Sequence, residues 1–359
     1  MSVSVCHIIG GIVGGGIEQV IINYCSRIKD IEFDLLYQYE PNLGCLQKLE
    51  RAGVKCFRIP DKKRHPIKHL FVIWSFLKKN KCDVVHVHLD WFLSWIICLV
   101  AIFAGVKKRI IHHHQVYQEK NNVSRMCFSV MRKMNMCFST HRVACSVAAA
   151  VNGFGRKAYE NGLVIVLQNA VDVKRFEYDE QKRKEIRQKY RINDRLCIGC
   201  IGRICFQKNQ MFLLSVCKQF LKSKKDVLLM LIGDGPDSGK IEKEIKRLGV
   251  EDNVLFLNTQ SDVAPFYSAM DVFCLPSRWE GLGMVLVEAQ INGLCCFASD
   301  KVPRAVKMSD NLTFLPIEDS SMWAEAVLNA TLSRDKNVDL KEYDINERYK
   351  DLERLYLGE

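Results

Sequence analysis

Residues 228–249, LLMLIGDGPDSGKIEKEIKRLG, contain the unit that decides the fold class. An apolar, β-rich run leads into a turn that contains Gly233 and Gly235, and a stretch with helical periodicity follows. A short strand, a turn and a longer helix form the repeating unit of parallel α/β sheets. The glycines allow the backbone to approach a ligand closely, although an ordinary tight turn would use them equally well.

The same unit recurs on both sides of a charged stretch at residues 178–195. With 359 residues the chain exceeds the usual size of a single core, so two domains are expected. We predict an α/β fold with domains at residues 1–170 and 171–335, followed by a C-terminal helix within 336–359. The candidate strands are residues 5–9, 33–39, 55–59, 83–89, 109–114, 142–147 and 164–170 in the first domain, and 196–202, 226–233, 253–258, 271–277, 295–299 and 312–316 in the second.

Two apolar patterns predict further helices. Ile345, Tyr349, Leu352 and Tyr356 recur at spacings that place them on one face of a terminal helix, which must dock on another surface. The run WFLSWIICLVAIFAGV at residues 91–106 is 16 residues long, just below the length of a membrane span, and is interpreted as a buried helix.

The cysteines and the first residues indicate a cytoplasmic protein. Many of the sixteen cysteines lie in apolar, strand-like runs and are interpreted as small core residues that stay reduced. Cys197, Cys200 and Cys205 resemble half of a zinc site, but no second pair of ligands completes it, so no metal is expected. Residues 1–16 lack a basic n-region and contain several glycines, so neither a signal peptide nor an anchor is expected.

The positive charge is concentrated in the first domain. Residues 1–170 contain 23 Lys and Arg against 11 Asp and Glu, a net charge of +12, whereas the remaining residues contain 29 against 30. The excess gathers at residues 61–81 and 107–142, where aromatic side chains are interleaved. Such a basic face suits an anionic membrane surface or nucleic acid, and a solvated charged face is the simpler alternative.

Residues 279–290, WEGLGMVLVEAQ, place two carboxylates around a predicted helix start. The helix is expected to begin near Met284, with Glu280 in the preceding loop and Glu288 on the second turn. Helical side chains tilt toward the N-terminus, which directs the Glu288 carboxylate back toward the opening, where the free N–H groups of the first turn favour an anion. Amides for phosphate oxygens and carboxylates for hydroxyls fit a nucleotide-sugar; acidic residues favoured by the helix dipole are the alternative.

Three other stretches offer polar groups at predicted strand ends. Arg203 and Lys208 lie in a turn after a strand, where ligands of parallel sheets bind, and together could hold a diphosphate. Residues 10–20 form a glycine-rich loop that fits neither the dinucleotide-binding nor the P-loop pattern. Strand alternation places His112 and His114 on one side of residues 109–115, so this run is not a metal cluster by spacing alone. A histidine at the strand end could activate a sugar hydroxyl, and a core histidine is the alternative.

Taken together, these motifs resemble a known family. The sequences IGRICFQKNQ, LIGDGP, PSRWEGLGMVLVEAQINGLCCFASD and LQNAVDVKRF resemble the retaining glycosyltransferases of the GT-B fold that carry an E-x7-E motif. The sequences KKRIIHHHQ and VACSVAAAVNGFG are similar to the bacterial branch that builds exopolysaccharide and capsule repeat units. The resemblance implies two facing Rossmann-like domains, with the acceptor on the first, the nucleotide-sugar on the second and the last helix crossing back to the first.

The resemblance also implies roles for individual residues, with electrostatic stabilisation of the departing diphosphate as the main catalytic effect. No metal or other cofactor is expected, and the chain contains no Asp-x-Asp. It implies that Arg203 and Lys208 bind the diphosphate, that Glu280 bonds to hydroxyls of the donor sugar and that Glu288 bonds to the ribose hydroxyls. Backbone amides or a close approach of the backbone are implied for Gly233, Gly283, Met284 and Val285, and Gly15 and Gly16 let their loop approach the donor. His114 is implied as the active-site histidine, with His112 as the alternative.

The expected activity is transfer of a sugar from a nucleotide-sugar, with UDP-sugars favoured, onto a lipid-linked saccharide of exopolysaccharide, capsule or O-antigen assembly. The protein is expected in the cytoplasm, peripheral to the inner face of the cell membrane, with nucleic acid excluded as a partner. Two alternatives remain open. One is sugar-nucleotide epimerisation or glucan elongation on the same fold, and the other is a non-catalytic module that binds membranes or nucleic acid through its basic half.

Overall fold

The computed structural model describes residues 2–89, 91–116, 122–222, 226–334 and 340–358. It divides into two compact units. Unit 1 contains Met1–Val171 and Glu342–Glu359, and unit 2 contains Asp172–Lys341. The chain therefore leaves unit 1 once and returns to it for its last residues. The predicted boundary between residues 335 and 336 lies outside the described residues.

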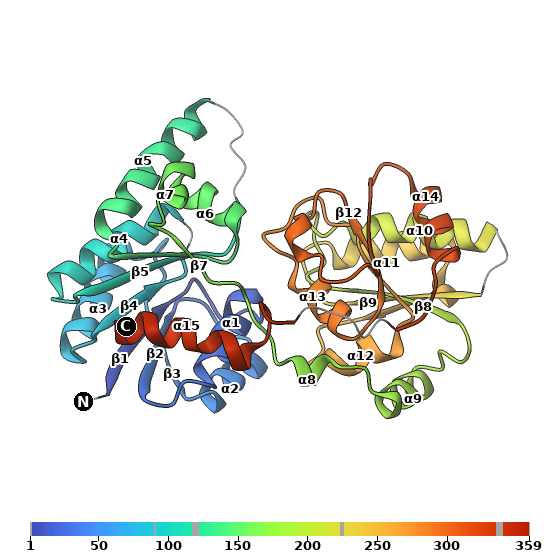
Figure 1. Cartoon of the computed structure of the whole chain (residues 1–359), viewed down its shortest axis with the longest axis horizontal. Helices are drawn as coiled ribbons and strands as arrows, with labels where there is room; N and C mark the ends of the chain where they lie inside the picture. The colour runs from blue at the N-terminus through green and yellow to red at the C-terminus, as the bar shows by residue number, and fades with distance from the viewer. Residues whose placement is uncertain (1, 90, 117–121, 223–225, 335–339, 359) are drawn as a thin grey trace. The chain divides into compact units, whose positions relative to one another are not determined.

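Unit 1 is built on a parallel sheet with seven strands in the order β3-β2-β1-β4-β5-β6-β7 (Figure 1). Each strand overlaps one of the apolar runs of the first domain, which confirms the prediction of a parallel α/β fold. The strands are β1 Val3–Ile8, β2 Ile31–Tyr37, β3 Val54–Arg58, β4 Val84–Val87, β5 Lys108–His113, β6 His141–Ala144 and β7 Ile165–Val166.

Helices cover both faces of this sheet, because alternate strand residues supply two separate hydrophobic cores. One face packs against α1 and α2 and against the C-terminal helix α15, and the other packs against α3, α4, α6 and α7. The helices are α1 Gly16–Cys25, α2 Leu43–Arg51, α3 Pro66–Lys79, α4 Trp91–Phe103, α5 Asn122–Phe138, α6 Val147–Phe154, α7 Arg156–Glu160 and α15 Ile345–Leu357.

The last strand of unit 1 is much shorter than its apolar run. The predicted strand covers residues 164–170, but β7 ends at Val166. The carbonyl groups that follow bond to side chains of α1: Tyr24 donates to Gln168 at 2.7 Å and Asn23 donates to Ala170 at 2.7 Å. The amide of Leu167 still donates to the carbonyl of Ala144 in β6 at 2.9 Å, and beyond it the segment is held by α1.

The apolar run at residues 91–106 forms α4, which is a helix as expected and is buried along one face. Ile97, Cys98 and Ala101 are buried, whereas Phe103 is exposed. Within the described part of the chain, no helix is both long and apolar enough to cross a membrane. All sixteen cysteines are free thiols, and eleven of them are buried.

Unit 2 is built on a second parallel sheet, with six strands in the order β10-β9-β8-β11-β12-β13. Each strand again overlaps a predicted run. The strands are β8 Leu196–Ile201, β9 Val227–Ile232, β10 Val254–Leu257, β11 Val272–Leu275, β12 Cys295–Ser299 and β13 Leu312–Leu315.

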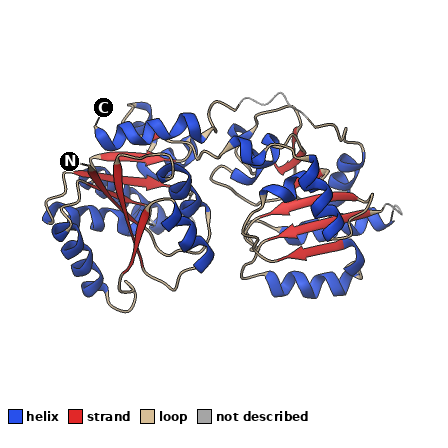
Figure 2. Cartoon of the chain, turned by 90° about the horizontal axis from the view of Figure 1, so that it is seen from below, coloured by secondary structure: helices blue, strands red, loops and turns tan. Residues whose placement is uncertain are grey.

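In each unit the strands form a central layer with helices on both sides (Figure 2). One face of the unit 2 sheet packs against α10, α11 and α14, around the buried Trp323. Helices α12 and α13 lie against the other face, with α9 packed on α12 and α8 on α13. The helices are α8 Val173–Phe176, α9 Glu180–Lys189, α10 Gln210–Lys222, α11 Ser238–Leu248, α12 Ala264–Ala269, α13 Met284–Ile291 and α14 Ser320–Leu328, with short 3-10 helices at Glu251–Asn253 and Arg304–Val306.

Candidate active site

The sheet of unit 2 reverses its strand order between β8 and β11. Ligands of open α/β sheets bind outside the carboxyl ends of the strands at such a point, because the loops of the two strands diverge there. Residues 202–209 follow β8 and residues 276–283 follow β11, so the two loops frame this position. They contain the predicted residues Arg203, Lys208 and Glu280.

An ion pair joins the two loops. Lys208 Nζ lies 2.6 Å from Glu280 Oε1, and the side chains are only 18% and 7% exposed. Ser277 Oγ donates a second hydrogen bond of 2.6 Å to the same carboxylate oxygen. The sequence predicted both charged residues at the site but neither their pairing nor the role of Ser277, whose position right after a strand is a weak signal.

Further hydrogen bonds hold the loops in place. The amide of Arg278 donates to the carbonyl of Gln207 at 2.8 Å, and the Gln207 side chain donates to the carbonyl of Trp279 at 3.0 Å. Asn209 Nδ2 donates to the carbonyl of Pro276 at 3.2 Å. The side chain of Arg203 is exposed on the same loop, and its carbonyl accepts from Gln210. Lys208 and Glu280 are thus fixed, while Arg203 is free to reach an anion outside the loop.

The two glycines after β9 serve the approach of one loop to another. A Cβ atom on Gly233 would lie 2.1 Å from the carbonyl oxygen of Gly202, and one on Gly235 would lie 2.1 Å from that of Ile204. Gly233 also has a φ of +143°, which other residues rarely adopt. The glycines therefore position the loop that contains Arg203 and Lys208, rather than only forming a tight turn.

Helix α13 begins at Met284, as predicted, and Gly283 precedes it with a φ of +90°. The N–H groups of the first turn of a helix have no partner within the helix, so those of Met284 and Val285 are suited to an anion. On the second turn, Glu288 accepts a hydrogen bond of 2.6 Å from the hydroxyl of Tyr267, a contact that the sequence did not predict.

Glu288 has a perturbed acidity. Close packing around its carboxyl group raises its pKa to about 7, while the hydrogen bond from Tyr267 and the positive charges of Arg175 and Lys208 act in the opposite direction. The influence of Lys208 places both residues in one electrostatic neighbourhood. Glu288 is thus a group that changes its charge near neutral pH.

Gly15 and Gly16 lie in unit 1, at the start of α1. The carboxylate of Glu18, which is buried, accepts from the amides of Val13 at 2.6 Å and Gly14 at 3.1 Å, and it therefore fixes the glycine-rich loop. This role of Glu18 was not predicted, although an acid in the first turn after a glycine-rich loop is a usable signal.

His114 belongs to a group of stacked histidines in unit 1. Its ring centroid lies 3.9 Å from that of His112, and its Nε2 lies 2.8 Å from Nδ1 of His88. His113 points to the opposite side of β5, where its ring packs on Phe154 at a centroid distance of 4.7 Å. The predicted alternation of the three histidines is confirmed, whereas the contribution of His88 from another strand was missed.

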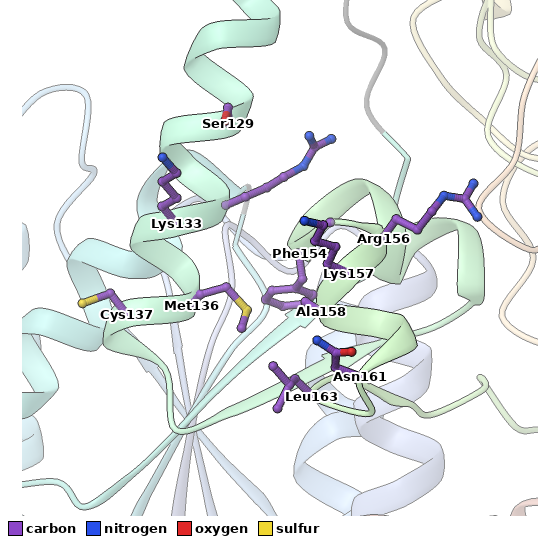
Figure 3. Close-up of a pocket in the computed structure, with 12 residues that line it drawn as sticks. Ser129, Lys133, Met136, Cys137, Phe154, Arg156, Lys157, Ala158, Asn161 and Leu163 are labelled. Carbon is purple, nitrogen blue, oxygen red and sulfur yellow. The ribbon is translucent and has the colours of Figure 1, made fainter.

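Unit 1 also contains an open pocket of about 810 Å³ (Figure 3). Figure 3 shows Met136 of α5 and Phe154 of α6 pointing toward each other at its base. The lining includes four cations from α5 and α7 and no acid: Arg132, Lys133, Arg156 and Lys157. The pocket falls within the basic half of the chain.

Comparisons with known proteins agree with this architecture. A model of the family Glycosyl transferases group 1 matches residues 182–347, and a model of Glycosyltransferase Family 4 matches residues 14–175. A protein of Bacillus subtilis (strain 168) with the name "Putative glycosyltransferase EpsF" is 31% identical over 348 residues. The match covers 94% of this chain and 90% of EpsF.

Two further comparisons concern a curated enzyme and a solved structure. An Escherichia coli UDP-Gal:alpha-D-GlcNAc-diphosphoundecaprenol alpha-1,3-galactosyltransferase is 24% identical over 302 residues, 78% of this chain and 77% of that enzyme. The crystal structure of Anabaena Alr3699/HepE in complex with UDP-glucose has a TM-score of 0.84 at 16% identity and covers 99% of this chain and 100% of that chain. A match of such length and identity to EpsF, together with the two family models, shows that this protein is a glycosyltransferase of the GT-B fold and belongs to the group 1 glycosyltransferases.

Proposed function

We propose that the protein transfers a sugar, with retention of the anomeric configuration, from a UDP-sugar to a lipid-linked saccharide during assembly of exopolysaccharide, capsule or O-antigen repeat units. The observation that supports this most directly is the paired Lys208 and Glu280 at the strand-order reversal of unit 2. A cation and an acid at one position match the two ends of a nucleotide-sugar's reacting bond, which are a diphosphate and a hydroxylated ring.

The roles of the donor-side residues follow from their chemistry. Arg203 and Lys208 bind the diphosphate, assisted by the first-turn amides of α13 that Gly283 positions. Glu280 accepts hydrogen bonds from donor sugar hydroxyls, and Glu288 does so from the ribose hydroxyls. The preference for UDP is supported by the E. coli relative, whose name specifies UDP-Gal, and by the Anabaena structure, whose title specifies UDP-glucose.

Catalysis is electrostatic in this proposal. The bond between the anomeric carbon and the diphosphate oxygen breaks, and negative charge develops on the departing UDP, where Arg203 and Lys208 stabilise it. The acceptor oxygen forms the new bond to the anomeric carbon, and its proton passes to an oxygen of the departing diphosphate. No metal is required for these steps, because the two cations and the helix amides supply the positive charge. In unit 1, His114 is the proposed active-site histidine, and Gly15 and Gly16 leave the loop before α1 without side chains that would hinder a substrate.

The acceptor proposal is supported by the surface of unit 1. The pocket at α5 and α7 combines cations with an apolar base, which suits a diphosphate attached to a lipid. On α5, Val123, Met126 and Val130 are 66%, 65% and 47% exposed and lie on one side of the helix. Exposed apolar side chains next to basic ones suit the interface of an anionic membrane. We therefore place the protein at the inner face of the cell membrane.

The donor is tested by thermal unfolding of the purified protein with a panel of UDP-, GDP- and ADP-sugars. A ligand that binds the native state raises the unfolding temperature. We expect stabilisation by UDP and UDP-sugars in the wild type and its loss in Lys208→Ala. Selective stabilisation by GDP- or ADP-sugars would overturn the assignment of the donor.

The reaction is tested with a synthetic polyprenyl-diphosphate-linked sugar as acceptor and with the donor alone. A product whose new glycosidic bond has the anomeric configuration of the donor is expected only when both substrates are present, and nuclear magnetic resonance determines that configuration. Conversion of the donor sugar without acceptor would favour epimerisation instead. An inverted linkage would contradict the retaining mechanism.

A further inference from the structure

Five imidazoles gather on one face of the sheet of unit 1. His7 lies on β1, His86 and His88 lie on β4 and directly after it, and His112 and His114 occupy the equivalent positions at β5. These three strands are neighbours in the sheet, with His7 paired to His86 in the register. The sheet reverses its strand order between β1 and β4, so the histidines lie near the position where α/β sheets bind ligands.

The ring nitrogens are close enough to converge on one ion. In each of two groups of three, His7–His86–His88 and His88–His112–His114, the ligand atoms all lie within 4.8 Å of one another. The rings are stacked, with centroids 4.1 Å apart for His86 and His88 and 3.9 Å apart for His112 and His114. His88 is common to both groups.

Several of these nitrogens are buried and have no hydrogen-bond partner among the residues that the structure describes. They are His86 Nε2, both nitrogens of His112 and His114 Nδ1. A neutral imidazole carries one N–H and one lone pair, so His112 leaves a donor and an acceptor unsatisfied. Buried polar atoms are normally satisfied, and several exceptions in one place call for an explanation. A bound cation that accepts lone pairs from His112 and His114 accounts for part of this group and leaves His86 Nε2 outside it.

A neutral imidazole keeps the lone pair that a metal ion needs. The group also contains its own outer contacts, because His7 Nδ1 lies 2.9 Å from His88 Nε2 and His86 Nδ1 lies 2.7 Å from the hydroxyl of Tyr356.

We propose that His88, His112 and His114 bind one divalent transition-metal ion of the zinc type through their imidazole nitrogens. This group is preferred over His7–His86–His88 because His114 is partly exposed and gives an ion access, whereas the other three rings are buried. His88 then keeps its contact with His7 through the nitrogen that faces away from His114. Three imidazoles are a known ligand set for Zn²⁺, with a fourth position for water.

The inference rests on unit 1 alone and does not depend on the proposed sugar transfer. It departs from the expectation, made for the whole chain, that no metal is bound, and from the interpretation that residues 109–115 are not a metal cluster by spacing alone. An ion here would fix the ring of His114.

The test begins with the full-length protein after removal of metals by a chelator. Equilibrium dialysis against Zn²⁺ with elemental analysis is expected to give one tightly bound ion per chain. X-ray absorption at the zinc edge then identifies the ligands, with nitrogen at about 2.0 to 2.1 Å and no sulfur at about 2.3 Å. Because the chain has sixteen free thiols, a sulfur shell or the absence of imidazole scattering would overturn the proposal.

Variants locate the ion. His88→Gln and His112→Gln are expected to weaken Zn²⁺ binding by more than about 100-fold, beyond the usual effect of an outer-shell change. His113→Gln is the matched control, because this buried ring lies on the same strand but faces the other core. Wild-type affinity in His112→Gln, or loss of the ion in His113→Gln, would overturn the assignment. If a variant fails to fold by circular dichroism, the absorption spectrum of the wild type decides.

Discussion

Replacement of Lys208 by methionine tests the centre of the proposed donor site. The change keeps the aliphatic part of the side chain and removes the charge that lies 2.6 Å from Glu280. Breaking a buried ion pair costs about 3 to 5 kcal/mol, because the remaining charge has lost its partner. Since Ser277 still donates to the same oxygen and Lys208 is 18% exposed, we expect a loss of unfolding free energy near or somewhat below the lower end, about 2 to 3 kcal/mol.

Removal of Lys208 should also slow sugar transfer. If Lys208 also bonds to the donor diphosphate, its removal deletes one charge-assisted hydrogen bond, worth about 1.5 to 3 kcal/mol. At about 1.4 kcal/mol per factor of ten, kcat/KM should fall about 10- to 150-fold. The assay is initial-rate sugar transfer at subsaturating donor, combined with urea unfolding. Lys240→Met is the control, because Lys240 forms an ion pair of the same length, 2.6 Å, but is 72% exposed and should change neither quantity measurably.

A double variant separates the two effects. Glu280→Gln removes the carboxylate charge, so the Lys208→Met/Glu280→Gln protein should be more stable than Lys208→Met while its activity stays low. Simple addition of the two stability losses would show that the residues do not act as a pair. Retention of wild-type kcat/KM by Lys208→Met would refute the assignment of the diphosphate position.

Three other predictions test different parts of the molecule. Because burial raises the pKa of Glu288 to about 7, donor affinity measured by calorimetry should increase as the pH rises through that value, and Glu288→Gln should abolish the dependence. The folded state holds this proton more tightly than the unfolded state, so the contribution of Glu288 to stability should fall over the same range. Gly233→Ala should lower the unfolding free energy by at least about 1 kcal/mol, since the new Cβ would lie 2.1 Å from backbone, whereas Gly239→Ala, which meets nothing within 4 Å, should not destabilise the protein. Lys133→Glu combined with Lys157→Glu should reduce cosedimentation with anionic vesicles and leave stabilisation by UDP unchanged; unaltered vesicle binding would contradict the proposed membrane surface.

The secondary structure was largely predictable because its signals are local. Each of the thirteen apolar runs overlaps a strand, and α13 begins at Met284 as its two preceding glycines indicated. Residues 167–170 are the exception, because the predicted strand extends to Ala170 whereas β7 ends at Val166. Side chains of α1 bond to that backbone, and the sequence of the run contains no information about them.

The side-chain pairs of the site were less predictable because they depend on strand order. Lys208 and Glu280 are 72 residues apart, so the sequence could place each at a strand end without showing that they touch. Alternation predicted that His112 and His114 share a face. Their meeting with His88 follows only from the adjacency of β4 and β5, which no local pattern reveals.

The path of the chain has a consequence for the birth of the protein on the ribosome. Helix α15 contributes Ile345, Leu352 and Tyr356 to the core of unit 1. Val171, which directly precedes unit 2, forms a parallel bridge with Asp344, which follows unit 2. Residues 172–341 are synthesised before α15 exists, so unit 2 is able to fold while unit 1 still exposes an uncovered apolar face. The first unit to emerge is therefore the last to be finished, and a chain truncated near residue 341 would combine a complete unit 2 with an aggregation-prone unit 1.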